Sequence, residues 1–341
     1  MRVVHFQRKP GVRHFSIERL FEDIRHSIAK DIEVDTCINK YLSTGFFNRV
    51  YDTCRAMRRQ GDINHITGDV HFLSFLMQRS RTVLTIHDCV TLERLSGLRY
   101  WVYFFFWYWL PVRRSAVVTV ISQSTKKELD KHLNTSRLSI EIIPNCVSTE
   151  FQPSAKPFNT HCPNILQIGT SENKNLLRIT KALAGIPCTL VIVGELSENQ
   201  RNSLQNNKIN FINHIGIDRE QLVKLYQQSD IVMFASLYEG FGLPILEANA
   251  IGRPVITSNI YSMPGVAGNA ACYVNPYQVK EINTAVKRII NDSAYRTLLI
   301  ENGFQNVENY RPEVIAEKYA QLYRKLYSDK KHPLNTKLQV K

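Results

Sequence analysis

The sequence lacks paired cysteines. Its seven cysteines are scattered along 341 residues, and no two of them form a Cys-x-x-Cys pair. This arrangement indicates neither a structural zinc site nor a dithiol redox motif. A disulfide framework would be unusual in a chain of this length. We therefore expect reduced thiols and a cytoplasmic location.

Long hydrophobic segments are missing too. The first twenty residues contain five Arg and Lys residues, which leaves no apolar core for a signal peptide. The thirteen apolar and aromatic residues at 100–112 are too few to cross a hydrocarbon layer as a helix, which takes about 20 residues. Contact with a membrane is then expected only as peripheral attachment, at the inner face of the cytoplasmic membrane.

Glycine and proline are sparse, and acidic residues are the minority charge. The 15 Gly and 13 Pro exclude collagen-like and low-complexity chains. A hydrophobic fraction of 44% is typical of a globular protein, and the length suits about two domains.

Lys and Arg number 43 against 30 Asp and Glu, a net charge of +13. This excess predicts an anionic partner: nucleic acid, a membrane surface or a phosphorylated small molecule.

Short β-branched runs, each followed by a helical pattern, predict parallel strands in doubly wound α/β domains. These runs are 3–6, 83–86, 117–121, 165–168, 189–193, 231–234 and 255–257. A proline-containing stretch at 151–161 without apolar periodicity suggests a domain boundary. We expect a first domain at 1–150, a second at 158–309, and a terminal helix with a basic tail at 310–341 that returns toward the first domain.

The segment 100–112 allows two interpretations. It holds all three tryptophans and is flanked by Arg99 and Arg113. Aromatic residues bordered by arginine are typical of an interfacial membrane anchor. A helix buried in the first domain fits the same composition equally well, and the sequence leaves both interpretations open.

A glycine turn follows the predicted strand at 231–234. Gly240 and Gly242 allow backbone N–H groups to approach a ligand, and the helix expected after them adds a partial positive charge. Such a turn is suited to a phosphate or pyrophosphate. Glu239 and Glu247 bracket it, and carboxylates beside a phosphate site are suited to hydroxyl groups; a sugar nucleotide offers both. The alternative is a tight turn without a ligand and two solvated glutamates.

This motif, with Gly252 and Pro254 after it, closely resembles the donor site of family 4 glycosyltransferases. Those are retaining enzymes of the GT-B fold, in which two Rossmann-like α/β domains face a central cleft. Further segments resemble the family in the same order along the chain: 85–88, 120–129, 142–145, 167–176 and 262–268.

The resemblance implies a role for each matching residue. Glu239 matches the glutamate that contacts the transferred sugar, and Glu247 the one that binds the ribose. His87 matches a histidine that reaches the donor sugar from the first domain; the less favoured alternative is a hydrogen-bonded core residue. Lys174 matches the cation that neutralises the leaving diphosphate, a charge that builds as the bond breaks. The implied catalytic residues are therefore His87, Lys174 and Glu239, and the other donor-binding positions are Gly11, Gly169, Gly240, Phe241, Gly242, Leu243 and Glu247.

The sequence departs from the family pattern in three places. Asn173 stands where many relatives have an arginine, Gly265 where a glutamate is common, and the loop around Gly11 has one glycine instead of two or three. The departure at Asn173 leaves a second cation unassigned. Candidates elsewhere in the chain are Arg8, Lys9 and Arg178.

The resemblance implies a retaining, metal-independent transfer of a sugar, with mannose as a candidate, from a nucleotide-diphosphate donor to a saccharide. We expect O-antigen or capsule type polysaccharide as the product and no cofactor besides the donor. The charge and segment 100–112 favour a lipid-linked acceptor at an anionic membrane surface over nucleic acid, for which no binding pattern is present. The alternative is a catalytically weak, sugar-nucleotide-binding or regulatory protein of the same fold.

Overall fold

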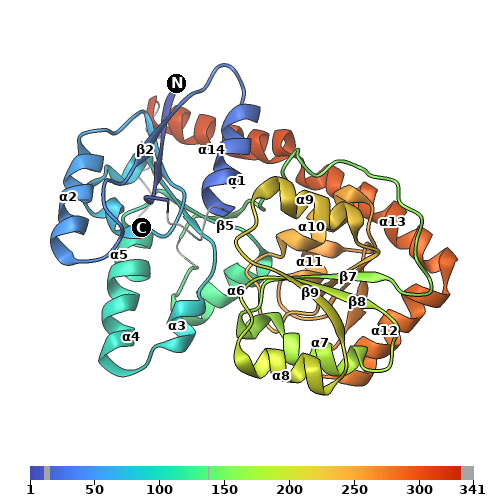
Figure 1. Ribbon diagram of the computed structural model, residues 1–341. Helices are drawn as coiled ribbons and strands as arrows, with labels where there is room; N and C mark the ends of the chain where they lie inside the picture. The colour runs from blue at the N-terminus through green and yellow to red at the C-terminus, as the bar shows by residue number, and fades with distance from the viewer. Residues whose placement is uncertain (11–15, 137, 332–341) are drawn as a thin grey trace, which may run out of the picture. The chain divides into compact units, whose positions relative to one another are not determined.

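The computed structural model describes residues 1–10, 16–136 and 138–331 (Figure 1). Within it the chain forms two compact units. The first contains Met1–Cys146 together with the chain from Pro312 onward, and the second is Val147–Arg311. The first unit is therefore built from two separate stretches of sequence.

The first unit is a six-stranded parallel sheet with the order β2-β1-β3-β4-β5-β6. Its strands are β1 Arg2–Gln7, β2 Glu33–Ile38, β3 Ile63–Ile66, β4 Thr82–Ile86, β5 Val117–Val120 and β6 Ile140–Ile142. Its helices are α1 Ser16–Ser27, α2 Phe46–Met57, η1 His71–Leu76, η2 Arg79–Arg81, α3 Val90–Arg94, α4 Gly97–Phe104, η3 Phe105–Trp109, α5 Leu110–Arg113, α6 Gln123–His132 and α14 Pro312–Lys331.

The second unit repeats this plan with the strand order β12-β11-β10-β7-β8-β9. Its strands are β7 Asn164–Ile168, β8 Thr189–Val193, β9 Asn210–His214, β10 Ile231–Phe234, β11 Val255–Ser258 and β12 Cys272–Val274. Its helices are η4 Glu172–Lys174, α7 Leu176–Leu183, α8 Glu198–Asn206, α9 Arg219–Gln228, α10 Leu243–Ile251, α11 Met263–Ala267, α12 Val279–Asn291, α13 Ser293–Val307 and η5 Glu308–Tyr310. Helices α9 and α10 lie on one side of the sheet, with α7 and α8 on the other (Figure 1).

The doubly wound α/β prediction is confirmed, and all seven predicted strands are present. In the second sheet the winding direction reverses between β7 and β10, which are hydrogen-bonded neighbours. Ligands of doubly wound folds bind beyond the carboxyl ends of the strands at such a switch point. The loops after β7 and β10 are therefore the place to look for a site.

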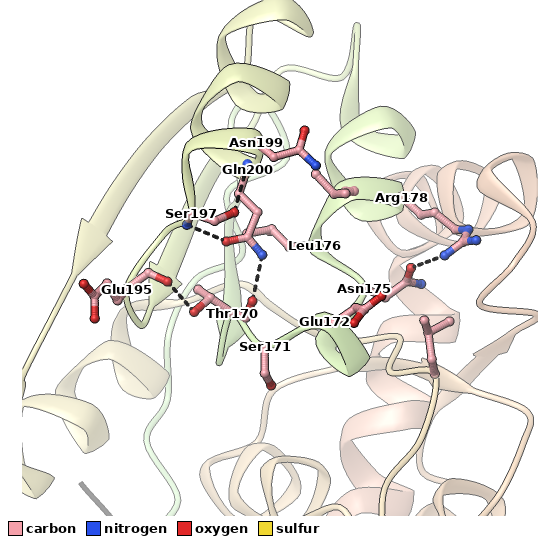
Figure 2. A pocket seen from close by; sticks show the side chains of 12 residues that line it. Thr170, Ser171, Glu172, Asn175, Leu176, Arg178, Glu195, Ser197, Asn199 and Gln200 are labelled. Atoms are coloured by element: carbon pink, nitrogen blue, oxygen red, sulfur yellow. Dashed lines mark hydrogen bonds between the residues drawn. The ribbon is translucent and has the colours of Figure 1, made fainter. Parts of the chain in front are cut away.

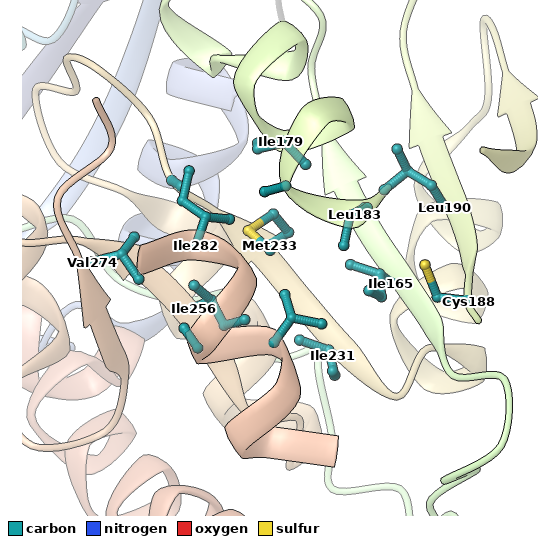
Figure 3. Packing of buried hydrophobic residues seen from close by; sticks show 14 of the residues in the cluster. Ile165, Ile179, Leu183, Cys188, Leu190, Ile231, Met233, Ile256, Val274 and Ile282 are labelled. Carbon is teal, nitrogen blue, oxygen red and sulfur yellow. The ribbon is translucent and has the colours of Figure 1, made fainter. Parts of the chain in front are cut away.

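The core of the second unit consists of aliphatic side chains between the sheet and its helices (Figure 3). Ile165, Met233 and Ile256 come from three adjacent strands, and Leu183 and Ile282 from the covering helices; all five are fully buried. Each such side chain contributes about 1.5–3 kcal/mol through burial. This packing fixes the strands whose ends carry the site.

The first unit has a polar network inside its core. The Tyr323 hydroxyl of α14 lies 3.0 Å from His5 Nε2 and 2.6 Å from His65 Nδ1. His65 Nε2 lies 2.7 Å from Thr85 Oγ1, which lies 2.6 Å from Thr119 Oγ1. These side chains are completely buried, and burial lowers the pKa of His65 to about 3 and that of His5 well below its usual range. The imidazoles are therefore neutral parts of the core, and they hold α14 to the sheet.

The aromatic segment forms one helix, α4-η3-α5, with a π-helical turn in its middle. Phe104 and Tyr108 face the core and are buried, whereas Trp101 and Phe106 are exposed. The two interpretations of 100–112 thus describe opposite sides of one helix: a buried side, and an exposed aromatic side whose contact with a membrane stays a prediction. Among the described residues, no helix combines the length and apolarity that a membrane span requires.

Candidate active site

Lys174 and Glu239 meet at the switch point of the second sheet. Lys174 follows β7 and Glu239 follows β10, and Lys174 Nζ lies 2.6 Å from Glu239 Oε1. Their side chains are only 17% and 16% exposed, and the ammonium also lies 4.6 Å from the centre of the Phe234 ring. Two residues that are 65 positions apart in the sequence thus form one partly buried charged pair.

Asn175 joins the two loops that carry this pair. It adopts a left-handed backbone conformation with φ +61° and begins α7. Its side-chain amide donates hydrogen bonds to the carbonyl oxygens of Ala235 at 3.0 Å and Pro276 at 2.8 Å. These bonds connect the loops after β7, β10 and β12, so the position of Lys174 is determined by backbone on both sides of the switch point.

Gly169 provides room for the Lys174 side chain. Its φ is +86°, and a Cβ atom there would lie 3.1 Å from Lys174 Cε and 3.2 Å from Cγ. We expect Gly169→Ala to leave the fold intact and to lower kcat/KM about tenfold, because small displacements of a positioned group are costly in catalysis. Steady-state kinetics measure the effect, with Gly185→Ala as the control, since that glycine also has a positive φ but open space around it. Equal losses in both variants would contradict a role through Lys174.

The predicted phosphate turn is a glycine-dependent helix start. Gly242 has φ +118° and caps α10, and a Cβ there would lie 3.1 Å from Ile245 Cδ1. The Ser262 hydroxyl lies 2.8 Å from the carbonyl oxygen of Glu239 and 2.7 Å from that of Phe241. These contacts hold the backbone of the turn against the loop that carries Ser262. The turn, with Gly240 and Leu243, therefore directs the N-terminal N–H groups of α10 along the carboxyl edge of the sheet. Binding of a phosphate by these groups stays a prediction.

Glu247 is buried in α10, so the alternative that it is solvated is wrong. The Tyr226 hydroxyl donates a 2.6 Å hydrogen bond to its Oε2, and Arg219 Nη1 lies 3.6 Å from its Oε1. Burial raises the pKa of the Glu247 carboxyl, while Arg219 and Tyr226 act in the opposite direction. Both partners lie on α9 and were missed by the sequence analysis, because no motif marks them.

A polar pocket of about 630 Å³ lies at the ends of β7 and β8, lined in part by Glu172 and Asn175 on either side of Lys174 in the sequence (Figure 2). The Thr170 hydroxyl donates to the Glu195 carbonyl at 2.6 Å, and Gln200 Nε2 donates to the Thr170 carbonyl at 2.7 Å. Ser197 and Gln200 form a reciprocal capping box at the start of α8. This Ser-x-x-Gln spacing after a strand was the one sequence signal that could have identified this side of the pocket.

The structure narrows the candidates for a second positive charge beside Lys174. Asn173 donates to the Tyr238 carbonyl at 3.0 Å and to Glu239 Oε1 at 3.3 Å, so it braces Glu239 without adding charge. Arg178 lines the pocket and donates to Asn175 Oδ1 at 3.1 Å (Figure 2). It is the candidate that the structure places beside the Lys174 loop.

The other two candidate cations belong to the first unit. Arg8 forms ion pairs there with Glu18 at 2.6 Å and with Asp69 at 3.0 Å. Lys9 is exposed. The predicted phosphate contact of Gly11 lies outside the described residues.

His87 lies at the end of β4 and is 8% exposed. Its Nε2 lies 2.8 Å from the Thr67 carbonyl oxygen, which can only accept, so Nε2 carries a proton. The ring is thus oriented by a backbone bond, and its approach to a donor sugar stays a prediction. Among the residues that the structure describes, no three His, Cys, Asp or Glu side chains are grouped to hold a metal ion.

Comparisons with known proteins concern the family and the fold of the chain. Residues 148–306 match the family described as glycosyl transferases group 1, and residues 54–151 match glycosyltransferase family 4. The chain is 27% identical over 223 residues to the O-antigen chain mannosyltransferase RfbU of Salmonella typhimurium, a match that covers 62% of this chain and 61% of that protein. The first curated relatives are matched over 26%, 61% and 30% of their own lengths, so the chain spans less than two thirds of each.

Two solved structures show the fold. Sucrose-phosphate synthase from Thermosynechococcus elongatus matches with a TM-score of 0.77 at 18% identity, over 96% of this chain and 99% of that one. HepE from Anabaena, solved in complex with UDP and glucose, matches with a TM-score of 0.72 at 16% identity, over 95% of this chain and 100% of that one. The two family matches together extend over residues 54–306, and the chain belongs to the glycosyl transferases group 1 family, with the GT-B fold.

Proposed function

We propose that this chain is a retaining glycosyltransferase that moves a sugar from a nucleotide-diphosphate donor to a hydroxyl of a saccharide acceptor. The Lys174–Glu239 pair beside the N-terminus of α10 carries the proposal, because it combines a cation for phosphate with a carboxylate for sugar hydroxyls. Mannose is the proposed sugar and O-antigen type polysaccharide the proposed product. The similarity to the mannosyltransferase RfbU supports both assignments.

The proposed reaction breaks the bond between the sugar C1 and the diphosphate oxygen and forms one between C1 and the acceptor oxygen. Negative charge builds on the departing phosphate, and Lys174 with the N–H groups of α10 stabilises it. The departing phosphate takes the acceptor proton on the same face, which retains the configuration at C1. When the donor binds, Lys174 exchanges its ion pair with Glu239 for one with the phosphate, and Glu239 then accepts hydrogen bonds from the sugar hydroxyls. We propose that no metal takes part, because these groups supply the positive charge.

The nucleobase is proposed to occupy the polar pocket at the ends of β7 and β8, and the ribose to lie toward Glu247, which is not among the residues that line this pocket. The pocket volume of about 630 Å³ lies within the roughly 300–1,000 Å³ of small-molecule sites. Glu247 is proposed to bind the ribose hydroxyls, because a buried carboxylate already fixed by Tyr226 and Arg219 costs little further ordering. The UDP complex of the structurally similar HepE supports a nucleotide-diphosphate donor.

The acceptor is proposed to be a lipid-linked saccharide at the cytoplasmic face of a membrane. The net charge of +13 and the exposed side of the aromatic helix support an anionic membrane surface as a partner. Nucleic acid is not a proposed partner.

Donor binding tests the proposal directly. We expect one member of a panel of nucleotide sugars, such as GDP-mannose among GDP-, UDP- and dTDP-sugars, to raise the melting temperature of the protein. Glu247→Gln is expected to weaken that binding about tenfold, because it removes a charge-assisted hydrogen bond to the ribose. Titration calorimetry measures both affinities.

Glu220→Gln is the matched control, since Glu220 is an exposed carboxylate on α9 that pairs only with Lys224 in the part of the chain described. Absence of binding across the whole panel, or binding that Glu247→Gln leaves unchanged, would contradict the proposed donor site. Binding without any turnover would favour the catalytically weak alternative, which the neutral Asn173 beside Lys174 makes worth testing.

A further inference from the structure

The first unit contains an apolar pocket that is separate from the proposed donor site in the second unit. It has a volume of about 820 Å³ and lies between α2, η1 and the aromatic helix. Val50, Phe75 and Leu76 line it from two of these elements, and Val102, Phe106 and Trp107 line it from the third. The size is that of a ligand site, and the lining is predominantly apolar.

The charged groups at this pocket are all positive. Arg49 and Arg99 line it, and no carboxylate does. Arg49 is fixed in place: its Nε and Nη2 donate to the Ser43 carbonyl at 3.1 and 2.9 Å, and its guanidinium lies 4.5 Å from the centre of the Trp107 ring. An apolar ligand with an anionic group therefore suits the pocket better than a neutral or cationic one.

Accessible acidic side chains are also absent from the two helices that line most of the pocket, α2 and the aromatic helix. The helix 97–113 contains no Asp or Glu. Asp52 is the one acidic residue of α2. It is buried, and its carboxylate accepts hydrogen bonds from the backbone N–H groups of Lys40 and Tyr41. The accessible charges of these two elements are therefore arginines.

Large apolar side chains continue from the pocket onto the surface. Phe46 and Leu98 line the pocket yet are 73% and 80% exposed, and Trp101 nearby on α4 is 63% exposed. Exposed aromatic and aliphatic side chains with arginine and without carboxylates are typical of a surface that contacts lipid head groups and the upper acyl region. A soluble ligand would leave these side chains in water.

We propose that the pocket binds one hydrocarbon chain of a phosphate-bearing membrane lipid, with the phosphate at Arg49 and Arg99. The chain fills the apolar volume, while Phe46, Leu98 and Trp101 contact the surrounding lipid. The inference rests on the proposed function and deepens it, because a lipid-linked acceptor is itself a phosphate-bearing membrane lipid. Its test requires neither donor nor turnover, so its failure is distinguishable from a failure of donor binding.

Tryptophan fluorescence tests the proposal, because all three tryptophans lie between 101 and 109. Trp107 lines the pocket, whereas Trp109 stacks on Phe105 at 5.1 Å and lines a different hollow. The probe is a hexadecyl phosphate with bromine atoms on its chain, used below its micelle concentration. In a variant that keeps only Trp107, with Trp101 and Trp109 replaced by Phe, we expect the probe to quench most of the emission saturably. A variant that keeps only Trp109 is expected to retain most of its emission.

Two controls separate chain binding from other outcomes. Val102→Asp places a carboxylate in the pocket wall and is expected to weaken probe binding at least about tenfold. Met57→Asp, at an exposed position of α2 that does not line the pocket, is expected to leave binding unchanged. A brominated hexadecyl trimethylammonium probe is expected to bind more weakly than the phosphate. Should the single-tryptophan variants fold poorly, the two Asp variants are compared in the wild-type background by total quenching.

Equal quenching of Trp107 and Trp109, or equal binding of the two head groups, would overturn the proposal. A chain that is dimeric without amphiphile, and that Val102→Asp renders monomeric, would instead assign this face to a second copy. Phosphatidylglycerol vesicles with the same brominated chains then check that a bilayer lipid gives the result seen with the free amphiphile.

Discussion

A Lys174→Met variant is expected to lose about 10²–10³ in kcat/KM, the loss typical of removing one group that stabilises developing negative charge. The methionine keeps the length of the side chain beside Gly169 and Phe234 but removes the charge that lies 2.6 Å from Glu239. Nucleotide release from the donor in the presence of acceptor measures the effect. We expect kcat to fall more than the donor affinity, because the charge on the phosphate is largest in the transition state.

Lys224→Met is the matched control. Lys224 also lies in the second unit and also pairs with a glutamate at 2.6 Å, but its side chain and that of Glu220 are mostly exposed. This change is expected to leave kcat/KM within about twofold, because exposed ion pairs contribute less than about 1 kcal/mol. A similar activity for the two variants would remove Lys174 from the mechanism. Circular dichroism confirms that both variants are folded.

Acid is expected to destabilise the first unit at a pH well above that at which carboxylates protonate. Burial lowers the pKa of His65 to about 3, so it stays neutral in the folded protein between pH 7 and pH 5. In the unfolded chain its pKa is about 6.5 and it takes up a proton in that range, so the free energy of unfolding falls as the pH falls. For His65 the loss is about 2 kcal/mol between pH 7 and pH 5. His5, whose pKa burial also lowers, acts in the same direction.

Urea unfolding followed by tryptophan fluorescence measures this loss, because every tryptophan belongs to the first unit. His65→Gln, which keeps a hydrogen-bonding side chain beside Tyr323 and Thr85, is expected to reduce the pH dependence by about one proton. His161→Gln, at an exposed position, serves as the control. A pH dependence that His65→Gln leaves unchanged would show that His65 does not hold the low pKa.

The fold was predictable where the strands are buried and apolar. Ile231–Phe234 and Thr189–Val193 are short β-branched runs in the middle of a sheet, and their pattern is sufficient. Asn210–His214 and Glu33–Ile38 were missed because they are edge strands, half covered and rich in polar residues. Cys272–Val274 has only three residues, too few to show a period.

The site was predictable only as separate residues. Spacing and resemblance selected Lys174, Glu239 and Glu247, but no sequence pattern states that Lys174 and Glu239 form an ion pair, since that depends on β7 lying next to β10. Tyr226 and Arg219, which surround Glu247, come from a helix without any motif. Such contacts depend on which strands and helices are neighbours. The sequence predicted doubly wound α/β domains but not the order of the strands within each sheet.

The hydrogen bonds from Tyr323 to His5 and His65 have a consequence for synthesis of the chain. The second unit is one continuous stretch, so it can fold as soon as Arg311 has left the ribosome, whereas the core of the first unit stays incomplete until α14 follows. From Cys146 to Tyr323 the delay is roughly 10 to 35 s at about 5–20 residues per second. During this interval the nascent first unit exposes the apolar side chains that α14 later covers, such as Phe21 and Ile63, and an exposed apolar surface of this kind promotes aggregation.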